Sequence, residues 1–365
     1  MWGGTRTEET LSEVSFAHAF SSIHPVDSHL MGKVSLVKHI EIVTPAPAGS
    51  LHGNRITALR WQRFLKRLHY RSTVSEQWSG NACELLIALH GLRSHDSIQR
   101  FKDAHPDHPL VLIMTGTDIY RDFQSSPKVV MSMEASDAIV ILQPAAMDSL
   151  PERFHQKVHV IYQSVKGVKR KSPPAQSFLT LVIGHLRAEK DPFCAAESLS
   201  LLRSDSRLRL VQLGKAMSPE FEERAVALEK KFGRYRWLGQ RSHSNTLQWL
   251  SRSHLMVISS IMEGGAHVVS EAIAIGIPVI ASDIAGNRGL LGENYPAYFP
   301  VGDQAALNRL LVKAEFDQAF YQGLCDAISA RYHIAKPELE QASIQKLLEE
   351  ILSDAKTASS GSIGH

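Results

Sequence analysis

The chain has 365 residues, of which 44% are hydrophobic and 21% are charged. This composition is that of an ordinary folded protein and excludes a fibrous or wholly disordered class, and the length predicts about two domains. Forty Lys and Arg against 37 Asp and Glu leave a formal charge of +3. A dedicated nucleic-acid binder or membrane-surface protein carries far more, so any anion binding must be local.

Cysteine usage and apolar stretches place further limits on the protein. Cys83, Cys194 and Cys325 are odd in number and far apart, which excludes a disulfide framework and a four-thiolate zinc site and suits a reducing compartment. The longest apolar runs fall short of the ~20 residues that span a bilayer. The N-terminus lacks a basic start followed by an apolar block, so no secretory signal is expected. We therefore expect a cytoplasmic protein with no membrane and no nucleic-acid partner.

Short runs rich in Val, Ile and Leu recur along the chain after a mixed N-terminal extension, and stretches of helical length separate them. The predicted strands are residues 40–44, 85–89, 110–115, 138–142, 158–161, 179–183, 209–213, 255–259 and 279–281. Near-continuous apolar strands separated by helices indicate parallel sheets that are covered on both faces. The predicted class is α/β, with two Rossmann-like, doubly wound domains.

Two helix starts are predicted from capping and periodicity. Apolar residues from Trp61 to Leu68 repeat at helical spacing, and Asn54 is the expected N-cap of that helix. Ser218 followed by Pro219 predicts the start of another helix.

A basic, Pro-containing stretch divides the chain and predicts an interdomain linker. The expected order is a loosely ordered extension (1–37), an N-terminal domain that binds the acceptor (38–164), the linker (165–177), a C-terminal nucleotide-sugar domain (178–330), a helix that packs back on the N-terminal domain (331–354) and a disordered tail (355–365). Ligands of such sheets bind beyond the carboxyl ends of strands, so a cleft between the two domains is the expected site.

The clearest motif follows a predicted strand directly. Gly264 and Gly265 let backbone approach a ligand closely, and a helix that begins near Ala266 presents unpaired N–H groups and its positive dipole end there. The pattern predicts a phosphate cradle. Glu263 in the preceding loop is expected to meet a sugar or the backbone, and Glu271, about two turns further along, is expected to accept hydrogen bonds from a ribose. A glycine pair alone more often marks only a tight turn.

The glycine pair does not stand alone, because the two flanking glutamates and a closing Gly-Ile-Pro at residues 276–278 accompany it. This combination resembles family 4 glycosyltransferases, which have the GT-B fold, two Rossmann-like domains facing across a cleft. The loop at residues 183–192 resembles the one in which those enzymes place an Arg and a Lys on the nucleotide diphosphate. Lys190 matches the Lys, whereas His185 stands at the Arg position and Arg187 follows two residues later.

The resemblance implies a set of functional residues on the C-terminal side. The implied nucleotide-sugar-binding residues are Gly184, Gly239, Gly264, Gly265, Ala266, His267, Val268 and Glu271. The implied catalytic residues are Lys190, Glu263, Arg187 and His90. The alternative interpretation is that Lys190 and Arg187 are solvated surface charges without a role in binding or catalysis.

Three loops after predicted N-terminal strands are candidates for acceptor binding. Many family 4 enzymes have His-Gly-Ser/Thr-Asp where this chain has Thr115 to Asp118, so the usual active-site His is missing. His90 and His95 are possible substitutes, although a lone His at a strand end is more often structural. The candidate acceptor-binding residues are Gly53, Asn54, Arg55, Arg93, Thr115, Gly116, Thr117, Asp118 and Arg121.

Residues 44–60, 90–101, 115–122, 184–192 and 263–292 together resemble the selenosugar synthases of selenoneine biosynthesis. The resemblance implies that the selenium of selenophosphate attacks the anomeric carbon of UDP-N-acetylglucosamine or UDP-glucose, that UDP leaves, and that hydrolysis then gives a 1-selenosugar and phosphate. Such an acceptor needs anchoring arginines rather than a base. No metal or cofactor is expected, because cations and a helix dipole take the place of a divalent ion.

Three other functions compete with this hypothesis. A conventional family 4 glycosyltransferase would transfer sugar to a lipid, a glycan or a small alcohol. An NAD-dependent dehydrogenase would show Gly-x-Gly-x-x-Gly after an early strand, which this chain lacks. A non-catalytic sensor would bind nucleotide sugar without turnover. The preferred sugar, retention or inversion at the anomeric carbon, and the oligomeric state are open at this stage.

Overall fold

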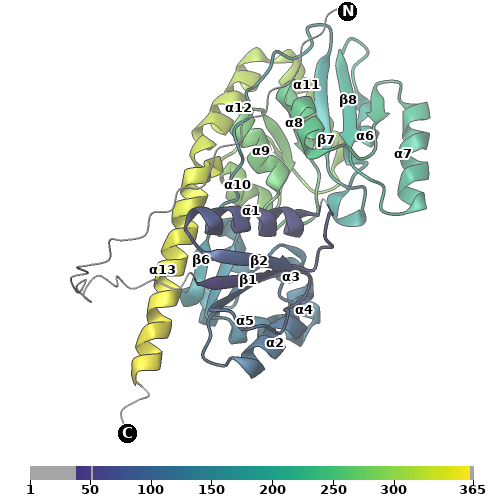
Figure 1. Cartoon of the computed structure of the whole chain (residues 1–365). Helices are drawn as coiled ribbons and strands as arrows, with labels where there is room; N and C mark the ends of the chain where they lie inside the picture. Colours follow the sequence, from purple (N-terminus) through teal and green to yellow (C-terminus); the bar gives the residue numbers. More distant parts are fainter. Residues whose placement is uncertain (1–37, 51, 362–365) are drawn as a thin grey trace, which may run out of the picture. The chain divides into compact units, whose positions relative to one another are not determined.

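A computed structural model of the chain describes residues 38–50 and 52–361 (Figure 1). The extension expected at 1–37 lies outside the described residues. Two six-stranded sheets form the framework of the described part, and every strand pair within them is parallel. The GT-B arrangement of two Rossmann-like units predicted from the sequence is confirmed.

The N-terminal sheet has the strand order β2-β1-β3-β4-β5-β6. Its strands are β1 (His39–Val43), β2 (Arg71–Ser75), β3 (Leu85–Leu89), β4 (Leu110–Ile113), β5 (Ala138–Ile141) and β6 (Val158–Val160). The helices between them are α1 (Gly53–Arg67), α2 (His95–Ala104), α3 (Thr117–Tyr120), α4 (Asp122–Ser125) and α5 (Pro127–Ala135), with 3₁₀ turns η1 (Pro144–Ser149) and η2 (Glu152–Lys157). Apolar side chains of the central strands pack into two cores, one on each face.

The C-terminal sheet has the order β12-β11-β10-β7-β8-β9. Its strands are β7 (Phe178–Ile183), β8 (Leu208–Leu213), β9 (Tyr235–Trp237), β10 (Leu255–Ile258), β11 (Val279–Ser282) and β12 (Tyr298–Phe299). Its helices are α6 (Cys194–Ser198), α7 (Pro219–Lys231), α8 (His243–Ser251), α9 (His267–Ile275), α10 (Ala285–Leu291), α11 (Gln304–Phe316) and α12 (Gln318–Ala330), with 3₁₀ turns η3 (Ala188–Lys190), η4 (Leu199–Leu201) and η5 (Tyr332–Ala335). One continuous apolar core covers this sheet.

All nine predicted strands are present, and the three strands that sequence analysis missed are β2, β9 and β12. Each of the three lies at an edge of its sheet. An edge strand has one neighbour and need not be apolar on both faces, and β2 has no fully buried residue. The continuous apolar runs that reveal central strands are therefore missing from these segments.

The helix starts agree with the sequence in one case and correct it in the other. Ser218 is the N-cap of α7, as predicted. The N-cap of α1 is His52 rather than Asn54, which is the second residue of the helix. His52 has extended backbone, and its carbonyl accepts the first helical hydrogen bond, from Ile56 N at 3.1 Å. The helix thus begins before the Asn side chain can cap it.

The C-terminal helix α13 (Pro337–Gly361) returns to the N-terminal sheet, which it passes in Figure 1. Ile344, Leu347, Leu348, Ile351 and Leu352 belong to the same buried cluster as residues of β1, β3 and α1. The helix continues beyond 354, where its end was expected, and the segment expected to be disordered from 355 is helical as far as Gly361. Among the residues described, no helix combines the length and apolar character needed to cross a membrane.

A buried polar network ties α13 to α1 at the crossing point. Arg60 Nε donates to both carboxylate oxygens of Glu340, at 2.9 and 3.0 Å, and Arg60 Nη2 donates to Gln163 Oε1 at 3.0 Å. Both members of the ion pair are buried. Breaking such a pair leaves an uncompensated buried charge, which costs about 3–5 kcal/mol. The network therefore fixes the position of Gln163, whose amide reaches the C-terminal domain.

Candidate active site

Strand order locates the expected ligand site in the C-terminal sheet. The order reverses between β7 and β10, so the loops after these two strands leave the same edge toward opposite faces. Such a switch point is where open parallel sheets bind their ligands. The loop after β7 carries Gly184 to Lys190, and the loop after β10 carries Glu263 to Ala266. Two motifs that lie about 75 residues apart in sequence thus meet at one place.

Lys190 and Glu263 form an ion pair at this switch point. Lys190 Nζ donates to Glu263 Oε1, and Ser260 Oγ donates to the same oxygen at 2.7 Å. The two charged side chains are 21% and 11% exposed, so the pair is shielded but reachable by a ligand. An ammonium in this setting can transfer its hydrogen bond from the carboxylate to an incoming phosphate oxygen.

The glycine motif brings the two domains into backbone contact. A Cβ on Gly264 would lie 2.5 Å from the carbonyl oxygen of Thr115, and a Cβ on Gly116 would lie 2.7 Å from Gly264 N. Gly116 also has a φ of +135°, which residues with side chains rarely adopt. A side chain at either position would force the loops apart. The glycine pair thus joins the nucleotide-side loop to the predicted acceptor loop.

Backbone donors lie beside this contact at the start of α9. Ala266 is the N-cap of the helix, and no side chain caps it. Gly265 is held from the N-terminal side, because Gln163 Nε2 donates to its carbonyl at 2.8 Å. An uncapped helix N-terminus with free N–H groups and a positive dipole end suits an anion. Val268 lies in the first turn of this helix and is half-buried.

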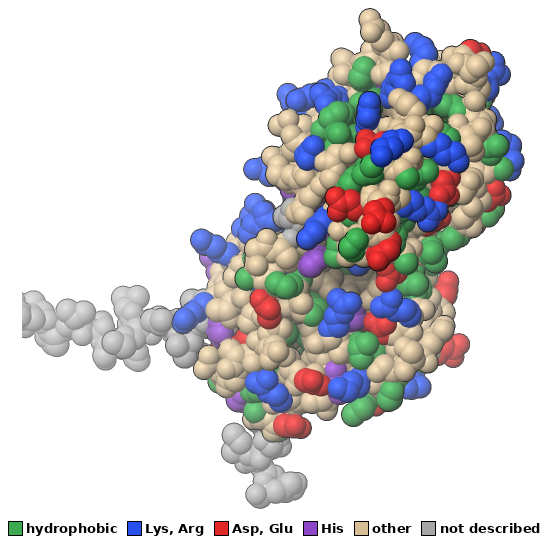
Figure 2. Space-filling view, turned by 90° about the vertical axis from the view of Figure 1, so that its right-hand side faces the viewer, with side chains coloured by type: hydrophobic (Ala, Val, Ile, Leu, Met, Phe, Trp, Pro, Cys, Tyr) green, Lys and Arg blue, Asp and Glu red, His purple; other side chains and the backbone are tan. Residues whose placement is uncertain are grey.

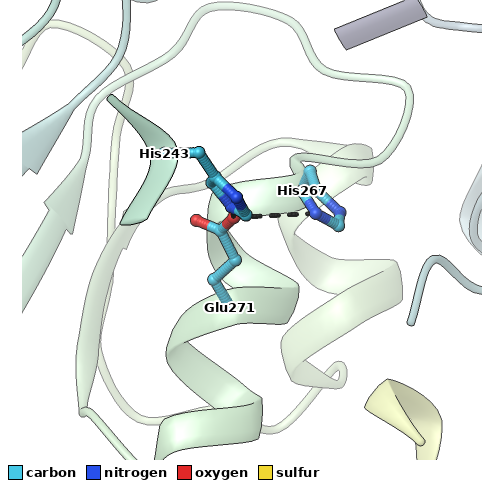
Figure 3. A group of neighbouring side chains, drawn as sticks. All are labelled: His243, His267 and Glu271. Atoms are coloured by element: carbon cyan, nitrogen blue, oxygen red, sulfur yellow. Dashed lines mark hydrogen bonds and ion pairs between the residues drawn. The ribbon is translucent and has the colours of Figure 1, made fainter. Parts of the chain in front are cut away.

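Glu271 lies one turn into α9, between two histidines (Figure 3). His243 Nε2 is 2.6 Å from Glu271 Oε1, and His267 Nε2 is 3.6 Å from the same oxygen. The hydrogen bond with Glu271 raises the pKa of His243, whereas burial lowers the pKa of His267 to about 4. His243 was not predicted from the sequence. A lone His at the start of α8 has no local motif that links it to Glu271.

His185 stands at the position of the family arginine, and its pKa is lowered from the ordinary histidine value. Burial is the largest cause of this lowered pKa, and the neighbouring charges of His52, Arg187, Lys190 and Lys215 lower it further. Arg187 itself is exposed, and its Nε lies 3.9 Å from Glu189. Several cations gathered around one histidine are a favourable setting for an anion.

The loop that contains Gly239, one of the implied nucleotide-sugar-binding residues, is fixed by hydrogen bonds to the main chain. Gly214 N donates to Gly239 O at 2.9 Å, and Trp237 Nε1 donates to Gly214 O at 2.9 Å. Gly214 in turn packs against Gly184, because a Cβ there would overlap the carbonyl of Gly184. The loops after β7, β8 and β9 are therefore linked to one another at this edge of the sheet.

On the N-terminal side, Asp118 and His90 support the loop from within rather than facing solvent. Asp118 is fully buried, and its carboxylate accepts from Gly91 N at 3.0 Å, Thr115 N at 2.9 Å and Gly116 N at 2.8 Å. His90 is 2% exposed, and its Nε2 is 3.0 Å from the hydroxyl of Thr117. Each side chain has its hydrogen-bonding atoms occupied by the loop, which favours positioning over substrate contact for both.

His95, the other substitute weighed in the sequence, is also internal. Its side chain is buried at the start of α2, with Nδ1 3.0 Å from Ser132 Oγ. Burial lowers its pKa. Neither histidine therefore presents a base to the ligand region in this structure.

The three candidate arginines differ in their partners. Arg121 Nε donates to Asp122 at 2.9 Å, and Arg121 Nη1 donates across the domains to Glu189 at 2.9 Å. Within the described part of the chain, no hydrogen bond or ion pair engages the side chain of Arg55 or Arg93. Arg55 Nε is buried without a partner. Arg55 lies in the first turn of α1 after Gly53 and Asn54, and Arg93 is exposed after β3.

The comparisons with known proteins agree with this geometry. Residues 166–330 match the family Glycosyl transferases group 1. This stretch contains the whole C-terminal sheet, and it is similar in sequence to that family. A curated relative, Glycosyltransferase 1 domain-containing protein 1 of Xenopus tropicalis, is 25% identical over 268 residues, which cover 66% of this chain and 77% of that protein.

Solved structures extend the likeness to both domains. Sucrose-phosphate synthase of Thermosynechococcus elongatus matches with a TM-score of 0.70 and 14% identity, covering 87% of this chain and all (100%) of that one. Anabaena HepE in complex with UDP and glucose matches with a TM-score of 0.65 and 15% identity, at the same coverage of both chains. These similarities establish the fold.

Charge is mixed on the face of the molecule that Figure 2 shows. On the face shown in Figure 2, Lys and Arg side chains are interspersed with Asp and Glu. The basic groups that converge near Lys190 are therefore a local feature rather than part of a basic surface. This pattern suits a small anionic ligand better than a polyanion.

Proposed function

We propose that this glycosyltransferase joins the sugar of UDP-N-acetylglucosamine or UDP-glucose to the selenium of selenophosphate, in the pathway to selenoneine. The bond between the anomeric carbon and the β-phosphate oxygen breaks, and its electron pair leaves with UDP. Selenium supplies the electron pair of the new carbon–selenium bond. Water then attacks phosphorus, so that the phosphoselenosugar and H₂O give a selenol and hydrogen phosphate.

The observation that carries the donor half is the Lys190–Glu263 pair beside the uncapped start of α9. In the proposal, the diphosphate takes the Lys190 ammonium and the N–H groups near Gly265 as hydrogen-bond donors. Its negative charge increases as the sugar bond breaks, and donors already in place stabilise that charge without reorganisation. Glu263, released from Lys190, is then free to accept from a sugar hydroxyl.

The acceptor half rests on cations without carboxylate partners. Selenophosphate is already an anionic nucleophile, so the reaction needs no base, and both buried histidines of the acceptor side have other partners. What such an acceptor needs is a fork of donors for its phosphate oxygens. The guanidinium groups of Arg55 and Arg93 donate no hydrogen bond within the described residues, whereas that of Arg121 donates to Asp122 and Glu189. We assign Arg55 as the main anchor, because its Nε is already desolvated.

A product assay tests the proposal directly. Purified full-length protein is incubated with UDP-N-acetylglucosamine or UDP-glucose, with and without selenophosphate, and the products are identified by mass spectrometry. The proposal expects UDP, phosphate and a selenium-containing sugar only when selenophosphate is present. Transfer to an alcohol, glycan or lipid in its absence would instead establish the conventional glycosyltransferase, the second hypothesis. Orthophosphate and thiophosphate are matched acceptor controls, because they preserve the anion and change the nucleophile.

A further inference from the structure

His243, His267 and Glu271 form a compact group of ligating atoms that the transfer reaction does not account for. One ligand atom from each residue lies within 4.8 Å of the other two. Both histidines direct a ring nitrogen toward the Glu271 carboxylate, as Figure 3 shows, and the distances are 2.6 and 3.6 Å. In the described part of the chain, no other group of three His, Cys, Asp or Glu side chains meets this spacing.

The ligand types and their geometry match a zinc site. Two imidazoles and one carboxylate are a common protein ligand set for Zn²⁺, with the fourth position open to water. At metal–ligand distances of about 2.0–2.2 Å, tetrahedral neighbours are roughly 3.3–3.6 Å apart. The observed separations of 2.6 and 3.6 Å bracket this value. A small outward shift of His243 would complete the geometry.

Helix geometry and exposure favour the same assignment. His267 and Glu271 are four residues apart on α9, so their side chains share one face of the helix. Glu271 is 5% exposed and His267 is 19% exposed, whereas His243 is 49% exposed. The inner two ligands are thus fixed by packing, and an ion can enter from solvent past His243. His267 Nδ1 has no partner among the described residues, so it is free to carry the ring proton while Nε2 faces the ion.

We propose that His243, His267 and Glu271 bind a zinc ion in the nucleotide-free enzyme, and that zinc and nucleotide exclude each other. The exclusion rests on the proposed function, which places the ribose at Glu271. Because the Glu271 side chain is 5% exposed, an ion held on its carboxylate would occupy the space through which ribose hydroxyls must approach it. Zinc would then inhibit the enzyme by competing with UDP-sugar, without taking part in the transfer.

Cobalt is a suitable probe, because Co²⁺ occupies zinc sites and its absorption reports tetrahedral coordination. Nucleotide-free, full-length protein is titrated with Co²⁺ and then with Zn²⁺. The proposal expects one Co²⁺ per chain with intense tetrahedral absorption, displaced by Zn²⁺. In His243→Ala we expect binding to weaken at least about tenfold, the loss that removing even an outer partner of a metal ligand produces. Because His243 is half exposed, this variant should keep its melting temperature, unlike a change at His267.

His333→Ala is the matched control, since this exposed histidine lies outside the group. Equal Co²⁺ affinity in wild type and His243→Ala would overturn the proposal, as would an octahedral spectrum. A UDP titration separates the two proposals. Release of Co²⁺ by UDP supports the metal site and the proposed position of the nucleotide. If Co²⁺ stays bound when UDP binds, zinc and nucleotide do not exclude each other, and the ribose does not lie at Glu271. UDP binding in a protein that takes up no Co²⁺ overturns the metal site alone.

Discussion

The two sides of the candidate site hold their charges differently. In the loops of the C-terminal sheet, functional side chains are paired with one another, Lys190 with Glu263 and His243 with Glu271. In the elements that follow the N-terminal strands, the Asp118 carboxylate accepts hydrogen bonds from backbone N–H groups, whereas Arg55 Nε is buried without a partner. On the C-terminal side, a ligand must therefore replace existing partners within the protein. On the N-terminal side, Arg55 Nε has no such partner and is available to an anion.

This difference indicates which interactions determine affinity on each side. A ligand that replaces an existing ion pair gains only the difference between two interactions. A ligand that meets a guanidinium whose Nε is already buried and unpaired gains more, because part of the cost of burying that group is already included in the fold. The nucleotide side should therefore contribute mainly to the transition state, and the acceptor side mainly to binding.

The largest expected effect is that of Lys190→Ala, which removes the paired cation from the nucleotide side. We expect kcat to fall about 100- to 1,000-fold, the usual result of losing one donor to a developing charge. The fold should survive, since Ser260 Oγ still holds Glu263 at 2.7 Å. Steady-state kinetics and thermal melting check both points, with Lys230→Ala, an exposed cation in the last turn of α7, as the control. Unchanged kcat would remove Lys190 from the mechanism.

Arg55→Ala tests the unpaired side. A hydrogen bond to a charged group contributes roughly 1.5–3 kcal/mol, so we expect the KM for selenophosphate to rise roughly 10- to 150-fold while the KM for UDP-sugar stays the same. Arg67→Ala, at the exposed end of the same helix, controls for the loss of one positive charge. Equal changes in both KM values would contradict the contrast drawn between the two sides.

Gly264→Ala tests whether the two sides must touch. The new methyl group would overlap the Thr115 backbone at 2.5 Å, and overpacking of this kind costs about 1–3 kcal/mol. We expect a lower melting temperature and reduced turnover, measured by calorimetry and the product assay. Gly233→Ala is the matched control, because a Cβ there meets nothing within 4 Å. A variant as stable as that control would show that the loops separate freely.

The smallest expected effect concerns protons at His185. Its pKa is lowered in the empty site by burial and by nearby cations, and a bound diphosphate would favour the charged form and raise it. UDP binding at a pH between the pKa values of His185 in the empty and the occupied site should therefore take up a proton, and affinity should increase as the pH falls through that window. Calorimetry in two buffers of different ionisation enthalpy measures the uptake.

The diphosphate of UDP titrates in the same range, so the comparison with His185→Asn isolates the protein's share. We expect this variant to lose the proton uptake that is due to His185 and to keep the uptake that is due to the diphosphate. The same uptake in both proteins would show that the diphosphate does not approach His185, and would remove this group from the cationic side.

How much of the site the sequence predicts depends on whether a residue lies in a motif next to a strand. Lys190 and Glu263 each follow a predicted strand, and the structure brings them into an ion pair because the carboxyl ends of the two strands share one sheet edge. His243 was missed, since its partner Glu271 lies 28 residues away on another helix. Sequence patterns report neighbours along the chain and along a sheet edge, but not contacts between the starts of two separate helices.

The sequence by itself determined the α/β class, the central strands and the glycine-lined loop before α9, because apolar runs and glycines act through local conformation and burial. Only the tertiary structure decided that His90 and Asp118 turn inward, that Arg121 is committed to Asp122 and Glu189, and that Arg55 is not. The reason is physical: whether a charged group is available to a ligand depends on which other polar groups reach it first, and those come from distant parts of the chain.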